Sequence, residues 1–106
     1  MPERGDLIWV DFDPSAGSEQ SGNRPAIVLS TQIFSRGTNL ALVAPITSTV
    51  RGHGMEVPVN GNSISGVVLC QQVKVIDYIE RNVEKAEKAP AGVTNEALKK
   101  VRAILA

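Results

Sequence analysis

Cysteine, histidine and aromatic residues are scarce in this sequence. It has one Cys, one His, one Trp, one Tyr and two Phe in 106 residues. A single cysteine excludes an internal disulfide, and beside one histidine it cannot complete a structural zinc site. Cys70 lies in the apolar run GVVLC, so we expect a small buried side chain with a raised pKa rather than a nucleophile. His53, in RGHGM, has no triad partner in sequence and is expected in an exposed turn.

Long apolar runs and an excess of charge are also missing. No stretch approaches the length of about 20 residues that spans a membrane, and the first residues, MPERGDLIWV, lack the plan of a signal peptide. We therefore expect a cytoplasmic protein. Lys and Arg balance Asp and Glu, with 11 of each pair. The total charge thus gives no sign of nucleic-acid binding, although residues 61–106 carry a small basic excess that is compatible with a local basic surface.

The rest of the sequence consists mainly of short β-branched or alternating runs, separated by clusters of Gly, Pro, Asn and Ser. This pattern predicts a single domain over residues 1–106, mainly β, with strands forming a small sheet or barrel. Pro58 has no N–H to donate, which restricts its run to a sheet edge or a bulge. The predicted strands are 7–12, 26–30, 40–46, 55–59, 66–76 and, less regularly, 78–85.

The last stretch, TNEALKKVRAILA, has a different period. Its apolar residues recur at helical spacing and its Lys and Arg residues fall on the other side, so it predicts a C-terminal α-helix that packs on the sheet. Thr94 is the expected N-cap, with Glu96 in the first turn. The apolar stripe consists of Ala97, Leu98, Val101, Ile104 and Leu105.

The segment GSEQSGNRP, at residues 17–25, is more polar than a connection between two strands requires. Pro25 restricts Arg24 to extended backbone, so the guanidinium is mounted on the beginning of a strand. Its planar fork of donors suits phosphate or carboxylate oxygens. Glu19 could orient that fork or accept a proton from a substrate. A weak surface ion pair between these side chains is the alternative explanation.

A second polar cluster, PITSTV at residues 45–50, ends an apolar strand. Thr47, Ser48 and Thr49 place hydroxyls where the strand leaves the core. Such hydroxyls bind phosphate oxygens or cap a turn, and turn capping is the simpler explanation. The spacing alone does not require Thr47 and Arg24 to meet.

The runs RGDLIWVDFDPSAGSEQSGNRPAIVLS, LVAPITS and GVVLCQQVKVID resemble, in order and spacing, the MazF/PemK family of bacterial toxin endoribonucleases. The resemblance covers nearly the whole chain. It implies a small SH3-like β-barrel of the kind also seen in the CcdB toxin, a homodimer, and cleavage of single-stranded RNA without a metal or other cofactor. It also implies a MazE-like antitoxin partner that covers the active groove with an extended, acidic and apolar tail.

The resemblance also assigns roles to residues. Arg24, before the proline, and Thr47, in the PITS strand, match the positions most often given catalytic roles, and Glu19 matches the acid of the GSEQ motif. Attack by a 2′-hydroxyl requires deprotonation, a stabilised phosphorane and protonation of the departing oxygen. Arg24 would neutralise the phosphorane and Thr47 would donate to a phosphate oxygen. Glu19 is assigned as the base, with a relay between Arg24 and the substrate as the alternative.

The sequence departs from the Kid/PemK type of the family, which has a histidine before the glutamate of GSEQ and an arginine and an aspartate in the later strand. Ser18, Leu69 and Gln71 stand at those positions. That alternative set of catalytic residues is therefore absent, which favours Arg24 and Thr47.

With so few aromatic side chains, RNA selection is expected to depend on hydrogen bonds rather than base stacking. The candidate RNA-binding residues are Gln20, Asn23, Ser48, Gln72 and Lys74, with a purely structural place in a strand as the alternative for Gln72 and Lys74.

Two alternatives to the ribonuclease remain. A CcdB-like toxin inhibits a topoisomerase by protein binding and has no catalytic residues, and a shared fold does not fix function. An inactive relative that only binds an antitoxin is the other.

Overall fold

The computed structural model describes residues 1–12 and 22–106. The strands are β1 (Asp6–Phe12), β2 (Gly22–Val28), β3 (Leu40–Thr47), β4 (Glu56–Asn60), β5 (Ser65–Leu69), β6 (Lys74–Asp77) and β7 (Glu84–Lys88). The helices are α1 (Gln32–Thr38), α2 (Val93–Leu105) and a short 3₁₀ turn, η1 (Cys70–Gln72). The mainly β architecture with a C-terminal helix agrees with the sequence prediction.

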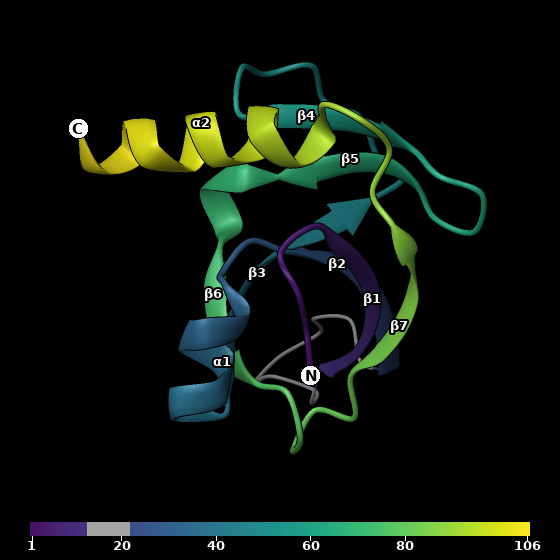
Figure 1. Cartoon of the computed structure of the whole chain (residues 1–106). Coiled ribbons are helices and arrows are strands. Elements are labelled where there is room, and N and C mark those ends of the chain that lie inside the picture. The colour runs from purple at the N-terminus through teal and green to yellow at the C-terminus, as the bar shows by residue number, and fades with distance from the viewer. Residues whose placement is uncertain (13–21) are drawn as a thin grey trace.

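The strands form a curled antiparallel sheet in the order β4-β5-β3-β2-β1-β7, with β6 also paired to β3 (Figure 1). β3 is the shared element, because its first half pairs with β6 and its end pairs with β5. Buried side chains lie on both faces of this curled sheet, and α2 lies alongside β4 and β5. Pro58 lies in β4, at an edge of this order, which confirms the edge placement expected from its missing N–H.

Side-chain alternation divides the core into two buried clusters on opposite faces of β1, β2 and β3. The α2 face holds Leu7, Ile27, Ala44 and Ile46 together with Val93 and Ala97 of the helix. The other face, called here the inner face, holds Ile8, Val10, Ala26, Val28, Ala41, Val43 and Ile76. Side chains of odd number on β3 and of even number on β2 therefore belong to the inner face.

α2 begins earlier than its sequence predicts. Gly92 is the N-cap residue, in the left-handed conformation with φ of 87°, and Thr94 lies inside the first turn. The N-cap prediction for Thr94 was wrong, because the turn after Pro90 starts the helix at Val93, whose N–H donates to the Pro90 carbonyl at 3.3 Å. No helix in the described residues is long and apolar enough to cross a membrane.

Only the first half of the predicted apolar stripe of α2 is covered. Ala97 is fully buried, whereas Ile104 and Leu105 are 50% and 86% exposed. The helix projects beyond the sheet at its C-terminal end, so none of the described strands lies against its last turn (Figure 1). The prediction that Ile104 and Leu105 pack on the sheet was therefore wrong for the isolated chain.

The single strand predicted at 66–76 is two strands separated by η1. Cys70 turns inward at η1 and is fully buried, and its N–H donates to the Met55 carbonyl at 3.2 Å. Before this break the chain pairs, as β5, with β4 and with the end of β3. After the break it pairs, as β6, with the first half of β3. The last predicted strand, 78–85, is also shifted, because residues 78–82 form turns and β7 begins at Glu84.

α1 was not predicted. Thr31 caps it by accepting from the Phe34 N–H at 3.2 Å, and Asn39 ends it in the left-handed conformation with φ of 62°. Both are ordinary capping residues. The helix has only seven residues and one buried side chain, Ser35, so it has no apolar stripe from which to predict it.

Candidate functional site

Arg24 is held by the sheet. It lies in β2, opposite Val10 of β1, and is partly buried. Extended backbone at the beginning of a strand is what the following proline predicted. In the part of the chain that the structure describes, the Arg24 guanidinium has no hydrogen-bond or ion-pair partner. Within the described residues, nothing competes with an anionic ligand for its donors.

Thr47 is the last residue of β3 and lies on the same face of the sheet as Arg24. The ladder between β2 and β3 ends at the pair Ala26 and Pro45. The same register, extended by two residues beyond this pair, reaches Arg24 in β2 and Thr47 in β3. Because side chains alternate between the two faces of a strand, both belong to the inner face. The structure thus brings these two predicted catalytic residues to neighbouring strand ends on one face.

The Thr47 side chain has a structural role as well. Its Oγ1 accepts from the Thr49 N–H at 3.1 Å, which is the turn-capping contact expected for this cluster. A hydroxyl that accepts one such bond still carries its own hydrogen, so Thr47 can donate to a phosphate oxygen at the same time.

Gly66 fixes the backbone at Thr47, and the sequence analysis did not single it out. It has φ of +144°, and a Cβ built on it would overlap the Thr47 carbonyl oxygen. Any side chain at this position would push β5 away from the end of β3. The signal in the sequence was a glycine at the beginning of an otherwise apolar run.

Asn23 and Ser48, both predicted to contact RNA, flank the two catalytic candidates. Both are exposed. Asn23 pairs with Asp11 in the β1–β2 ladder, and alternation directs it to the face opposite Arg24. Ser48 directly follows Thr47, beyond the end of β3. The structure therefore keeps Ser48 beside the catalytic candidates and sets Asn23 on the other face.

Gln72 and Lys74 lie later in the chain, in η1 and β6. Gln72 is exposed in η1, so the strand placement weighed as its alternative role was wrong. Lys74 is exposed in β6 and pairs with Val43, on the inner face, so its strand placement is observed. Val43 precedes Thr47 along β3 by about 13 Å of strand. Lys74 therefore lies on the same face as Thr47 but too far away to contact the same phosphate.

Glu19 and Gln20 lie outside the described residues. The role of Glu19 as general base and that of Gln20 in RNA contact stay predictions.

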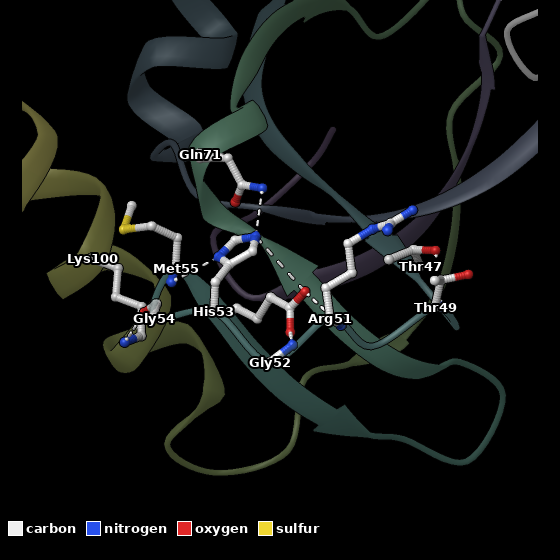
Figure 2. A network of polar contacts seen from close by, with 10 residues as sticks. Thr47, Thr49, Arg51, Gly52, His53, Gly54, Met55, Gln71 and Lys100 are labelled. Atoms are coloured by element: carbon white, nitrogen blue, oxygen red, sulfur yellow. Dashed lines mark hydrogen bonds and ion pairs between the residues drawn. The ribbon is translucent and has the colours of Figure 1, made fainter.

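The loop that follows Thr47, residues 48–55, is held by the network of polar contacts in Figure 2. The Glu56 side chain is 4% exposed. Its carboxylate accepts from the Arg51 N–H at 3.1 Å and from the Gly52 N–H at 2.8 Å. Burial raises the pKa of Glu56, but these backbone hydrogen bonds and the charges of His53 and Arg51 outweigh it and lower the pKa overall.

His53 connects this loop to η1. Its Nδ1 accepts from the Met55 N–H at 3.3 Å. Nε2 lies 3.2 Å from the Gln71 amide and 3.8 Å from Glu56 Oε2. His53 is thus an exposed turn residue, as predicted, that helps to hold the loop.

α2 holds the other side of the loop. Lys100 Nζ donates to the Gly54 carbonyl at 2.6 Å.

The predicted inert role of Cys70 is supported, because burial raises the pKa of its thiol and the charge of Lys100 offsets only part of that rise. Within residues 1–12 and 22–106, no group of three His, Cys, Asp or Glu side chains could hold a metal ion.

This curled sheet with a C-terminal helix is also the architecture of MazF from Deinococcus radiodurans. A crystal structure of that protein matches with a TM-score of 0.87 and 38% identity, and covers 98% of this chain and 96% of the other. The MazE-MazF complex from the same organism matches with a TM-score of 0.88 and 36% identity, covering 98% and 95%. The fold and site therefore define a small antiparallel β protein of the MazF type.

The sequence comparison identifies the family. Residues 3–105 match the PemK-like, MazF-like toxin family of type II toxin-antitoxin systems. The endoribonuclease toxin MazF of Escherichia coli K12 is 46% identical over 85 residues, which are 80% of this chain and 77% of the relative. The endoribonuclease PemK of Escherichia coli is 38% identical over 108 residues, 97% of this chain and 81% of the relative. The chain belongs to this toxin family, which favours the ribonuclease over the CcdB-like alternative.

Proposed function

We propose that this chain is a toxin endoribonuclease that cleaves single-stranded RNA at specific sequences by attack of a ribose 2′-hydroxyl on the adjacent phosphate. The observation that carries the proposal is the placement of Arg24 and Thr47 at neighbouring strand ends on one face, in a family whose relatives are named endoribonucleases. The products are a 2′,3′-cyclic phosphate and a 5′-hydroxyl.

Arg24 supplies the positive charge for the reaction. Its guanidinium binds two oxygens of the scissile phosphate and stabilises the charge that grows on the phosphorane. Thr47 donates its hydroxyl hydrogen to a phosphate oxygen while its oxygen keeps the bond to the Thr49 N–H. We assign the base that deprotonates the 2′-hydroxyl to Glu19; a proton relay between substrate and Arg24 is the other candidate.

RNA leaves this centre over exposed polar residues, because the middle of the inner face is buried. Ser48 contacts the nucleotide beside the scissile phosphate, and Lys74 a more distant one on the same face. Gln72, exposed in η1, is a third contact. Asn23 lies on the other face and Gln20 precedes the strand, so these two serve base selection if the RNA wraps around the end of β2.

The partners follow from the family and from the exposed end of α2. MazF of Deinococcus radiodurans is solved in complex with MazE, and we infer a MazE-like antitoxin for this chain.

Ile104 and Leu105 remain exposed in the single chain. We infer that a second copy covers them in a homodimer, since exposed large apolar side chains on a helix end are typical of an interface. The protein acts in the cytoplasm, where its RNA substrate is.

Cleavage in the presence of EDTA tests the proposed chemistry. Because Arg24 neutralises the phosphate and Thr47 donates a hydrogen bond to it without a metal, we expect the cleavage rate of a long RNA to be unchanged by EDTA. Sequencing of the fragments should find one recurring cut sequence, and the ends should be 2′,3′-cyclic phosphate and 5′-hydroxyl. Loss of cleavage on chelation, restored by added Mg²⁺, would contradict the mechanism, and 3′-hydroxyl ends would exclude attack by the 2′-hydroxyl.

A further inference from the structure

Arg51 is a cation that the mechanism above does not use. It is exposed in the loop of residues 48–55, four residues after Thr47. Figure 2 shows its side chain extending on the side where Thr47 and Thr49 lie. Its guanidinium makes no hydrogen bond or ion pair with any residue in the ranges that the structure describes.

The backbone that carries Arg51 is held in place more firmly than an exposed loop requires. Glu56, with its side chain 4% exposed, accepts from both the Arg51 and the Gly52 N–H groups. Gly52 has φ of +82°, a conformation that side chains rarely adopt, so the chain turns sharply just after Arg51. Burying a carboxylate costs free energy unless it is hydrogen-bonded, and here these bonds fix the Arg51 backbone.

The rest of the loop is attached to other elements. His53 reaches Gln71 in η1, and Gly54 accepts from Lys100 in α2. The loop is therefore preorganised, and preorganisation lowers the entropy lost when a ligand binds.

We propose that Arg51 binds the RNA phosphate next to the scissile one, and that Glu56 is the positioning residue that presents Arg51 to it. This proposal rests on the proposed function. A guanidinium suits a phosphate because its planar donors match two phosphate oxygens. The neighbouring Thr47 and Ser48 add hydroxyl groups, which are common phosphate donors in nucleic-acid interfaces. An acidic peptide is the competing ligand, but its carboxylates would not explain why these hydroxyl groups lie beside Arg51.

Salt-dependent RNA binding by Arg51→Gln tests the proposal. The probe is a short RNA that carries the mapped cut sequence, with 2′-deoxyribose at the cut nucleotide so that it stays intact. Each phosphate contact to a single strand contributes about 0.7 to the slope of log K against log salt. We expect Arg51→Gln to reduce the slope by about 0.7 and to weaken binding by about tenfold. The matched control is Arg36→Gln, in exposed α1, which removes the same charge and should leave the slope unchanged.

Glu56→Gln tests the positioning role. It removes the charge that holds the loop, so we expect a smaller salt slope for this variant alone. In the Arg51→Gln background it should cause no further change, because the contact that it positions is already gone. A merely structural role would lower the melting temperature without altering the slope of the folded protein, and additive effects of the two substitutions would overturn the positioning role.

The outcomes separate this proposal from the proposed function. If the wild-type protein neither binds nor cleaves RNA, the proposed function fails. If it does both and Arg51→Gln has the slope of Arg36→Gln, only the inference is overturned. Equal weakening of RNA and of a poly-glutamate peptide added as competitor probe supports a general anion site rather than an RNA phosphate contact, and would also overturn it.

Discussion

Arg24→Ala lowers the rate of RNA cleavage by about 10³-fold or more while the protein stays folded. The loss is large because the guanidinium is the charge that meets the phosphorane, and arginines that stabilise phosphoryl transfer contribute on this scale. The fold survives because Arg24 lies at the beginning of β2, outside both buried clusters, where we expect a substitution to cost about 1 kcal/mol or less. The measurements are the initial cleavage rate on a mapped RNA and the melting temperature.

Two further variants sharpen the result for Arg24. Arg24→Lys keeps the charge but loses the planar fork, so it should recover part of the rate. Arg36→Ala, in exposed α1, removes an arginine away from the inner face and should cleave at the wild-type rate. Expression of Arg24→Ala should no longer arrest growth. Full cleavage by a well-folded Arg24→Ala protein would remove Arg24 from the site.

Thr47→Val is expected to reduce cleavage by about 10²-fold. Valine keeps the β-branched shape that suits the end of β3, but it removes the hydroxyl that donates to the phosphate. It also removes the acceptor of the Thr49 N–H, which we expect to cost about 1 kcal/mol. Rates and unfolding free energies measured on the same preparations separate the two effects.

Thr47→Ser and Thr49→Val are the controls for the threonine. Serine restores the hydroxyl and should recover most of the rate. Thr49→Val removes a neighbouring hydroxyl but keeps the Thr49 backbone N–H that bonds to Thr47, so cleavage should be unchanged. If Thr47→Ser is as slow as Thr47→Val, or if Thr49→Val is equally impaired, the rate depends on the turn and not on a hydroxyl donated to the substrate.

Local patterns predicted the elements that depend on local order. The alternating runs of β1 and β3 and the helical period of α2 are visible in the sequence because burial on one face selects side chains at fixed intervals. Arg24 and Thr47 were identified from strand ends and from the family motifs. That they meet on one face depends on the antiparallel register of β2 and β3, which no local pattern specifies.

The loops depend on contacts between distant residues, and these were not predictable. Glu87 of β7 illustrates this, because its carboxylate accepts from the N–H groups of Asn62, Ser63 and Ile64 in the loop between β4 and β5. These hydrogen bonds lower the pKa of Glu87. In the sequence, Glu87 is one charge among several in a polar run, and nothing near it indicates the loop that it holds.

Glu56 was overlooked for a related reason. It begins the run EVPVN, which indicates an edge strand, and its role depends on a loop that folds back over it. An acidic residue directly before an apolar strand was the available signal. The contact between Lys100 and Gly54 likewise joins α2 to a loop 46 residues earlier in the chain.

The central claim is that the inner face, at the ends of β2 and β3, binds the scissile phosphate. The most direct test is a crystal structure of the protein with an RNA that carries the mapped cut sequence and a single 2′-deoxyribose that blocks cleavage. The account predicts the phosphate within about 3 Å of both the Arg24 guanidinium and the Thr47 hydroxyl. An ordered RNA whose scissile phosphate lies away from both groups would contradict it.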